Sequence, residues 1–383
     1  MNHRQRLSSG TSSTLAQPLR VGQFNLPAWA RYEAAMRGIF ERRYYTNQGP
    51  LVRQFEQVLQ EFLSVRHAVC VTNPTIAFMM ASEALGIEGQ VLVPALVNRA
   101  VEHALSWCGV ETVYCDVDPA SGMLTAQSLA ATVSPSVSAV LGANLWGDAC
   151  DLEAVNDFAR ARGIPALFDS IHAAGCAVAD RRLGSFGALE VLSFDSADIL
   201  NAAGGGCVTT NDDELAARLR NIRSSYGAGR AVKVVKTSNG RMSEAQAALG
   251  LLSFEDLEAN RLHNLRISEA YTARIRGIAG IRVVEPGAVS RSNHQALLCE
   301  VDEQVFGASR DALIAHLAAA DVEAHAVQTM HGAAGTQPAA ERIAASRLLL
   351  PVGAQVSEPV VDVVCDLIAQ LGDLSHGARG ATA

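Results

Sequence analysis

The sequence predicts an α/β fold in which a large domain with a mostly parallel seven-stranded sheet is followed by a smaller C-terminal α/β domain. From about residue 65, short apolar runs alternate with amphipathic stretches. Strands of this length, separated by helices, are typical of βαβ units, whose parallel sheets are covered on both faces. The expected strands are residues 68–72, 91–93, 112–115, 138–142, 166–168, 191–194 and 207–210.

Helical patterns fill the intervals between these strands. They cover residues 75–85, 100–107, 152–162 and 213–222, and the last two follow the N-cap candidates Asp151 and Asp212. A helical stretch without proline then runs from Glu244 to about Ile275. Beyond it we expect strands at 281–284 and 296–300 and helices at 310–320 and 359–371. We therefore divide the chain into a tail (1–20), a large domain (21–255) and a small C-terminal domain (256–383).

The composition is that of a globular protein with a sizeable core. Of its 383 residues 49% are apolar and 18% are charged. The net charge of −8 gives no general attraction for nucleic acid or an anionic membrane, so we expect neither partner. Residues 1–20 lack the apolar core of a signal peptide, which predicts a disordered tail. Eight scattered cysteines without a CxxC motif indicate reduced thiols in the cytoplasm.

Four polar motifs lie near the ends of the expected strands, where open α/β sheets build their sites. They are Asn73-Pro74-Thr75, Phe168-Asp169-Ser170-Ile171-His172, Ser193-Phe194-Asp195-Ser196-Ala197-Asp198 and Asn239-Gly240-Arg241-Met242-Ser243-Glu244. The first begins a helix, whose free N–H groups can bind a phosphate. The second places a carboxylate where it can keep a pyridine nitrogen protonated. Each motif alone is weakly specific, because caps and turns use the same residue types; their order and spacing are more specific.

Taken together, the motifs resemble those of the DegT/DnrJ/StrS family of sugar aminotransferases, fold-type I enzymes that use pyridoxal phosphate (PLP). The similarity runs from about Phe24 to Leu371, nearly the whole chain. Further matching stretches are residues 45–52, 113–119, 184–187 and 246–251. The resemblance implies a fold-type I large domain, a small-molecule substrate from amino-sugar or secondary-metabolite biosynthesis, and a homodimer with shared active sites.

The resemblance also implies roles for single residues. Asp169 matches the aspartate that pairs with the pyridine nitrogen, and His172 matches the residue that contacts the phenolic oxygen of the ring. Thr75 and Ser193 match phosphate ligands. Asn239 matches an asparagine that reaches the phosphate of the neighbouring subunit. These five residues are the expected cofactor-binding set.

Three positions depart from the family pattern. The family motif Ser-Phe-His-x-x-Lys ends here in Asp198, and a carboxylate cannot form the Schiff base that the family's lysine forms. Pro74 replaces a small residue and supplies no N–H to a phosphate. Asn98 stands where the family stacks an aromatic side chain on the ring; with Thr46 and Asn47 it forms the expected substrate side. We therefore predict that the chain is not a standard transaminase.

Several functions remain open at this point. A repurposed enzyme would hold PLP or pyridoxamine phosphate (PMP) without a covalent bond, as a subgroup of sugar 3-dehydratases with His at this position does with PMP, and would use Asp198, Asp195 and His172 as its acid–base groups. The same groups with Asp169 could instead work without a cofactor; their spacing predicts no metal site. The alternative is an inactive scaffold or a heterodimer partner of an active aminotransferase.

Two further alternatives concern lysine. Lys236, in a loop that leans toward the partner's site in the family, could act in trans, although a solvated loop lysine is the simpler interpretation. Asp198 could also be an introduced substitution that traps an intermediate, although this would not explain Pro74 and Asn98. The segment 324–327 lacks the arginines and aromatics expected for nucleotide-sugar contacts, so the substrate is not predicted.

Overall fold

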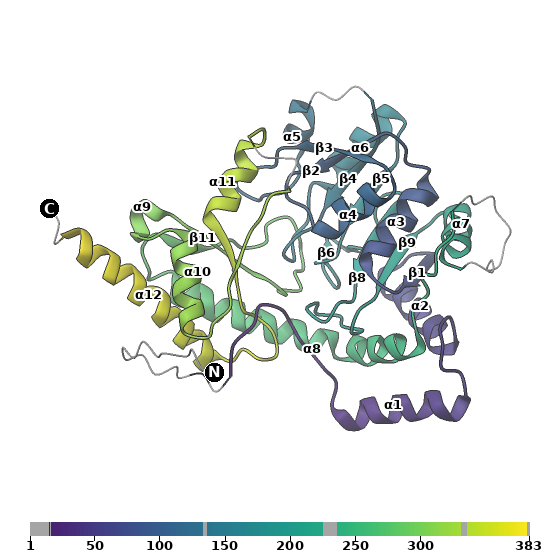
Figure 1. Cartoon of the computed structure of the whole chain (residues 1–383), viewed down its shortest axis with the longest axis horizontal. Helices are drawn as coiled ribbons and strands as arrows, with labels where there is room; N and C mark the ends of the chain where they lie inside the picture. Colours follow the sequence, from purple (N-terminus) through teal and green to yellow (C-terminus); the bar gives the residue numbers. More distant parts are fainter. Residues whose placement is uncertain (1–14, 16, 133–135, 225–235, 331–334, 381–383) are drawn as a thin grey trace, which may run out of the picture.

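A computed structural model of the chain describes residues 15, 17–132, 136–224, 236–330 and 335–380 (Figure 1). The seven expected strands form one sheet in the order β1-β9-β8-β5-β4-β2-β3. Only β9 runs against its neighbours in this sheet, so the prediction of a mostly parallel seven-stranded sheet is confirmed. The strands are β1 (His67–Val71), β2 (Gln90–Pro94), β3 (Glu111–Cys115), β4 (Val137–Ala143), β5 (Ala166–Asp169), β8 (Leu189–Ser193) and β9 (Gly206–Thr210).

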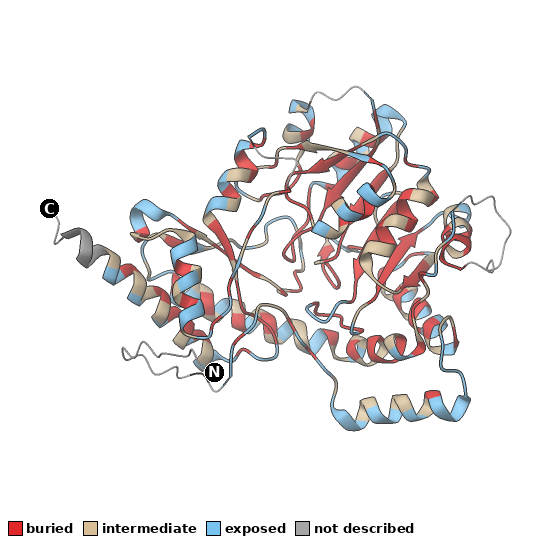
Figure 2. Cartoon of the chain, viewed as in Figure 1, coloured by how far each residue is buried: buried red, intermediate tan, exposed pale blue. Residues whose placement is uncertain are grey.

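Helices cover this sheet, which accounts for the almost uninterrupted burial of its central strands (Figure 2). They are α3 (Pro74–Leu85), α4 (Arg99–Trp107), α5 (Ala126–Ala131), α6 (Leu152–Arg162) and α7 (Asp213–Arg223). Asp151 and Asp212 cap α6 and α7 as expected, because their carboxylates accept N–H groups of the first turn. The strand residues are apolar on both faces because helices pack on both.

Two helices before the sheet were not among the sequence predictions. They are α1 (Trp29–Arg42), which protrudes at the bottom of Figure 1, and α2 (Pro50–Leu63). In α2, Val52, Phe55, Leu59 and Leu63 are buried at helical spacing, so the periodicity was readable. The described chain also begins to pack earlier than predicted. Leu19, inside the expected tail, is buried and forms a β-bridge with Val322, which corrects the end of that tail.

Helix α8 (Glu244–Ile275) links the large sheet to a second, antiparallel sheet of order β10-β11-β13-β12. The predicted boundary at residue 255 falls inside this single helix, and the division into two domains stays a prediction. The second sheet and its helices are β10 (Ile281–Val283), β11 (Leu297–Val301), β12 (His325–Ala326), β13 (Arg347–Leu350), α9 (Glu303–Phe306), α10 (Arg310–Ala319), α11 (Pro338–Ser346) and α12 (Glu358–Gly380). A hairpin of β6 (Ala177–Val178) and β7 (Arg181–Arg182) forms a third, small sheet. Within the described residues, no helix combines the length and hydropathy needed to cross a membrane.

Candidate active site

The topology brings two of the polar motifs to one edge of the large sheet. Asp169 is the last residue of β5, and Ser193 is the last residue of β8. These strands are parallel neighbours in the sheet, with Asp169 paired to Val191. Asp198 lies in the turn that follows β8. The carboxyl ends of adjacent parallel strands therefore place both carboxylates in the same region of the molecule.

Asp169 is fully buried, and its carboxylate is held by backbone groups. One oxygen accepts the N–H of Ile171 at 3.1 Å, and the other accepts the N–H of Asn98 at 3.4 Å. Burial raises the pKa of Asp169 to about 7, while these two hydrogen bonds act in the opposite direction. A cationic ring nitrogen bound beside it would stabilise the ionised carboxylate, so the position suits the role expected from the sequence.

His172 has a polar atom that no described residue satisfies. Its Nδ1 is buried and makes no hydrogen bond within the described part of the chain. Burial lowers the pKa of His172 to about 4, so the ring is neutral at pH 7. Its main-chain carbonyl accepts from the Asn293 amide at 3.0 Å, which fixes the loop after β5. A buried, unsatisfied ring nitrogen costs free energy unless a ligand hydroxyl or water completes it.

Asp198 is buried, with 5% of its surface exposed. Its carboxylate accepts the N–H of Asp195 at 2.9 Å and hydrogen-bonds the side chains of Ser193 and Gln295. Burial raises the pKa of Asp198 to about 7; those hydrogen bonds oppose the shift, and the charge of Asp195 adds to it. A carboxyl with a pKa near neutrality can both give and accept a proton at pH 7. Asp195 itself is exposed and accepts from Ser196.

The N-terminus of α3 offers few donors to a phosphate. The Asn73 side chain already accepts the N–H of Ile76 at 2.9 Å, and Pro74 has no N–H. Among the first three positions of the helix, the N–H of Thr75 is the one that no described residue engages. The Thr75 hydroxyl remains as a side-chain donor, whereas the Ser193 hydroxyl already hydrogen-bonds the Asp198 carboxylate and accepts the N–H of Asp195 at 3.3 Å. The start of α3, where we expect the phosphate, is thus poorer in donors than an ordinary helix N-terminus.

Of the remaining sequence-predicted residues, Asn98 contacts Asp169 through its N–H, whereas Thr46 and Asn47 lie against the start of α8. Asn98 caps α4 through the N–H of Ala100 at 2.9 Å and is half-buried. Thr46 is exposed, and Asn47 forms a β-bridge with Ser243 at the start of α8. Asn239 is exposed and accepts from the Arg241 guanidinium at 2.9 Å.

Two alternatives raised by the sequence can be compared with the geometry. The Lys236 ammonium lies 3.2 Å from the Glu83 carboxylate on α3 of the same chain. In the described portion of the chain, no group of three or more His, Cys, Asp or Glu side chains is arranged to hold a metal ion. Asp169, His172, Asp195 and Asp198 therefore do not converge into a metal-type cluster.

Sequence reasoning missed several residues that shape the site. Gln295 donates and accepts around Asp198: its amide oxygen accepts the N–H of Ile199 at 3.1 Å. Asn293 positions the loop that carries His172, and both residues come from the segment before β11. More than 90 residues separate this segment from β8, and no local pattern signals the contact. Asn73 had a readable signal, because Asn followed by Pro marks a capped helix start.

A buried polar chain lies behind the β5–β8 edge. The Asn144 amide donates to the Ser170 hydroxyl at 2.8 Å, and that hydroxyl donates to Glu190. The other oxygen of Glu190 accepts the N–H of Phe186 at 2.7 Å. Glu190 is fully buried, and burial raises its pKa to about 7. This network supports Ser170, the residue next to Asp169.

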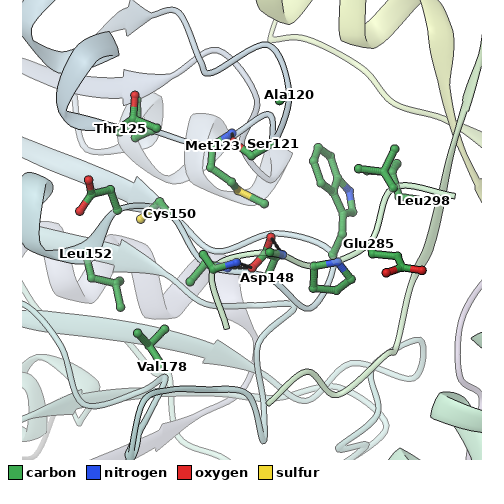
Figure 3. A pocket seen from close by; sticks show the side chains of 18 of the residues that line it. Ala120, Ser121, Met123, Thr125, Asp148, Cys150, Leu152, Val178, Glu285 and Leu298 are labelled. Atoms are coloured by element: carbon green, nitrogen blue, oxygen red, sulfur yellow. Dashed lines mark hydrogen bonds between the residues drawn. The ribbon is translucent and has the colours of Figure 1, made fainter. Parts of the chain in front are cut away.

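Two cavities adjoin these elements. A cavity of about 190 Å³ is lined by Asn98 and His172 together with Trp146 and the segment 326–330, so it belongs to the site. A larger cavity of about 780 Å³ lies between the large sheet and β10–β11, and Figure 3 shows Met123, Asp148 and Leu298 around it. None of the sequence-predicted site residues lines this larger space. Size alone therefore does not identify the candidate site.

Comparison with known proteins agrees with this geometry. The sequence model of the DegT/DnrJ/EryC1/StrS aminotransferase family matches residues 30–369. A dTDP-4-amino-4,6-dideoxy-D-glucose transaminase of Shigella dysenteriae is 26% identical over 370 residues, 93% of this chain and all of the relative. The crystal structure of DesI in the presence of its TDP-sugar product is 33% identical, with a TM-score of 0.89 over 96% of this chain and 97% of DesI. The aminotransferase TlmJ from Streptoalloteichus hindustanus is 28% identical, with a TM-score of 0.83 over 92% and 98% of the two chains.

Proposed function

The chain belongs to the DegT/DnrJ/EryC1/StrS aminotransferase family, and on that premise we propose that it is a repurposed enzyme of this fold and not a standard transaminase. The observation that carries the proposal is Asp198, a buried carboxyl with a pKa near 7, at the position where we expect the family's lysine. A carboxylate cannot bond covalently to PLP, but it can transfer a proton. The relatives that act on nucleotide-linked amino sugars support a small sugar-like substrate, which Thr46, Asn47 and Asn98 would meet.

The residues present fit PLP or PMP held without a covalent bond. The Nδ1 of His172, unsatisfied among the described residues, supports a contact with a ring hydroxyl, and the buried Asp169 carboxylate supports a contact with a ring nitrogen. Thr75 would supply a phosphate donor within the chain, and Ser193 would supply a second one on releasing Asp198. Asn239 is the donor we expect from a second subunit. When bound, the cofactor supplies an electron-withdrawing ring that stabilises negative charge on an adjacent carbon.

The acid–base work falls to the chain's own carboxyls. Asp198 holds or releases one proton at its Oδ atoms, and Ser193, Gln295 and the N–H of Asp195 orient the carboxyl. The exposed Asp195 carboxylate beside it raises the pKa of Asp198 by charge repulsion. Asp169 stays ionised when a cation lies against it. The eight cysteines, all free thiols, support a reducing compartment such as the cytoplasm.

A binding experiment tests this function. Purified protein is incubated with PMP or PLP, freed of excess, and measured by absorbance and by native and denaturing mass spectrometry. We expect one cofactor per chain that is present in the native spectrum and absent after denaturation, even after borohydride reduction. Failure to bind either cofactor at millimolar concentration would overturn the proposal. Size-exclusion chromatography with light scattering tests the homodimer.

The poor phosphate side favours a second candidate function, an inactive partner of an active aminotransferase. Asn73 and Pro74 leave one backbone donor at the start of α3, as expected if cofactor binding had lost its importance. In a heterodimer, Asn239 would serve the active partner's site. Co-expression with an active homologue distinguishes the two: stable 1:1 heterodimers together with absence of cofactor in this chain would favour the partner function.

A further inference from the structure

A cavity of about 380 Å³ lies apart from the candidate active site, between α2, α8 and the loop after His172. It carries three arginines from three separate segments: Arg182 on β7, Arg261 on α8 and Arg291 before β11. Phe62 and Phe254, packed edge to face at 5.0 Å, form its apolar wall. We call this cavity the arginine pocket. Its volume lies within the roughly 300–1,000 Å³ of small-molecule sites.

The carboxylates of the arginine pocket do not balance its guanidinium groups. Two guanidinium groups share Glu258. Its carboxylate accepts hydrogen bonds from the Arg261 guanidinium at 2.9 and 3.1 Å, and it also forms an ion pair with Arg291. The other lining carboxylate, Glu255, pairs with Arg31 at 2.7 Å. Three guanidinium groups therefore share one available carboxylate in a protein of net charge −8.

Arg182 has no carboxylate partner among the described residues. Its guanidinium donates to the carbonyl of Gly175 at 3.3 Å and stacks 4.1 Å from the centre of the Phe62 ring. Burial lowers the pKa of Arg182, and repulsion from Arg291 and Arg261 lowers it further, with Glu258 opposing. The side chain is thus held among like charges.

Arg291 has an unused donor. Its Nε is buried and makes no hydrogen bond within the described residues, although its Nη2 pairs with Glu258. An unsatisfied buried donor on a charged group is costly unless an acceptor completes it. Guanidinium groups bind the paired oxygens of phosphates and carboxylates through parallel N–H donors, so an oxyanion is the class of acceptor that suits a cavity lined by three arginines.

We propose that the arginine pocket is a binding site for a compact dianion, either a phosphate monoester or a dicarboxylate. Two negative charges match the excess of two guanidinium groups over Glu258, and the phenylalanine wall accepts a short apolar portion of the ligand. This inference does not depend on the proposed function, because none of the residues assigned to cofactor or substrate lines the pocket.

Asn293 links the arginine pocket to the loop that carries His172 in the candidate active site. The Asn293 amide lines the pocket and donates to the carbonyls of His172 and Ala174, both at 3.0 Å. Arg182 holds Gly175 in the same loop. A bound dianion that fixes Arg182 therefore also restrains the loop carrying His172. We expect slower amide hydrogen exchange in residues 171–176 when the pocket is filled.

Titration calorimetry of the full chain with inorganic phosphate and with malonate tests the proposal. We expect saturable 1:1 binding of one of them, about tenfold tighter than acetate; the tighter of the two identifies the ligand class. Arg182→Gln should weaken binding at least tenfold, since a charge-assisted hydrogen bond is lost. The matched control is Arg181→Gln, an equal charge change one residue away on β7, outside the pocket, which should change affinity less than twofold.

A variant that binds the dianion more tightly than the unaltered chain complements Arg182→Gln, because misfolding could explain a loss of affinity and could not explain a gain. Glu258→Gln removes the carboxylate that competes for Arg261 and Arg291, so binding should tighten about tenfold. Absence of saturable binding at 20 mM would overturn the proposal, as would equal weakening in the Arg181 and Arg182 variants. Loss of binding in Thr75→Val with no loss in Arg182→Gln would also overturn it, because the anion would then lie at the start of α3.

Discussion

The two sides of the candidate site differ in how completely the chain satisfies its own polar groups. On the ring side and among the described residues, the buried Nδ1 of His172 has no partner and Asp169 is held only by main-chain N–H groups. On the opposite side, Asn73 occupies a helix donor, Pro74 removes another, and Asp198 is satisfied by Ser193, Asp195 and Gln295. An unsatisfied buried group beside a cavity leaves room for a water or ligand atom to complete it, and a satisfied group does not.

This contrast suggests that the chain could keep the ability to bind a cofactor while losing the covalent chemistry of the family. On our proposal the ring side would receive a pyridine ring, whereas the proposed attachment side holds Asp198, an internally hydrogen-bonded carboxyl. A site with no remaining demand would more readily fill the space beside His172 with apolar side chains. The contrast therefore favours an enzyme with altered chemistry, and each of the following changes alters one side while leaving the other intact.

The largest effect is expected from Asp198→Lys. An amine at this position should form a covalent bond with PLP, giving a stoichiometric, borohydride-fixable adduct where the unaltered chain gives none. The adduct is measured by its absorbance where the ultraviolet meets the visible range and by denaturing mass spectrometry. Asp195→Lys makes the same charge change at an exposed position and serves as the control. If both variants or neither become labelled, Asp198 does not occupy the attachment position.

A smaller loss is expected from Asp169→Asn on the ring side. The substitution keeps the shape but removes the charge that holds a ring cation, so PMP affinity should fall roughly 10- to 100-fold, the worth of a charged hydrogen bond. Equilibrium titration followed by absorbance measures the change. Glu190→Gln neutralises another buried carboxyl, one that lies outside the ring side, and should leave affinity within twofold. Equal losses in the two variants would point to general destabilisation.

The order of helices and strands could largely be predicted from the sequence, because apolar runs such as 166–168 and 191–194 indicate strands buried between helices. The two-residue strands β6, β7 and β12 were not readable, since so short a segment has no periodicity. Asp169, His172 and Asp198 were predicted as site residues from motif order. Their protonation states could not be predicted from the sequence, because the burial that raises the pKa of Asp198 results from tertiary packing. Gln295, which hydrogen-bonds Asp198, also lies in a segment distant in sequence.

The next smaller effect is a gain in PMP affinity, which we expect from Pro74→Ala on the phosphate side. The change restores one N–H at the start of α3, next to the free N–H of Thr75, and should tighten PMP binding about tenfold. Pyridoxamine without the phosphate provides the control, because its affinity should not change. Equal tightening for both ligands would show that the phosphate does not lie at α3. An unchanged affinity for PMP would contradict the assignment of Thr75.

The smallest effect concerns stability, and it tests whether burial alone sets the carboxyl pKa values behind the ring side. The pKa of Glu190 is raised by burial from about 4.5 to about 7 in the folded chain, so its contribution to stability is present below the unfolded value and is lost as pH rises through 7. Glu190→Gln cannot ionise and escapes this loss. Its melting temperature relative to the unaltered chain should therefore rise between pH 5 and pH 8, by on the order of 2 °C. Glu153→Gln, on the exposed face of α6, should show no such trend. A difference that is constant with pH would mean that the Ser170 and Phe186 hydrogen bonds offset the burial of Glu190 entirely.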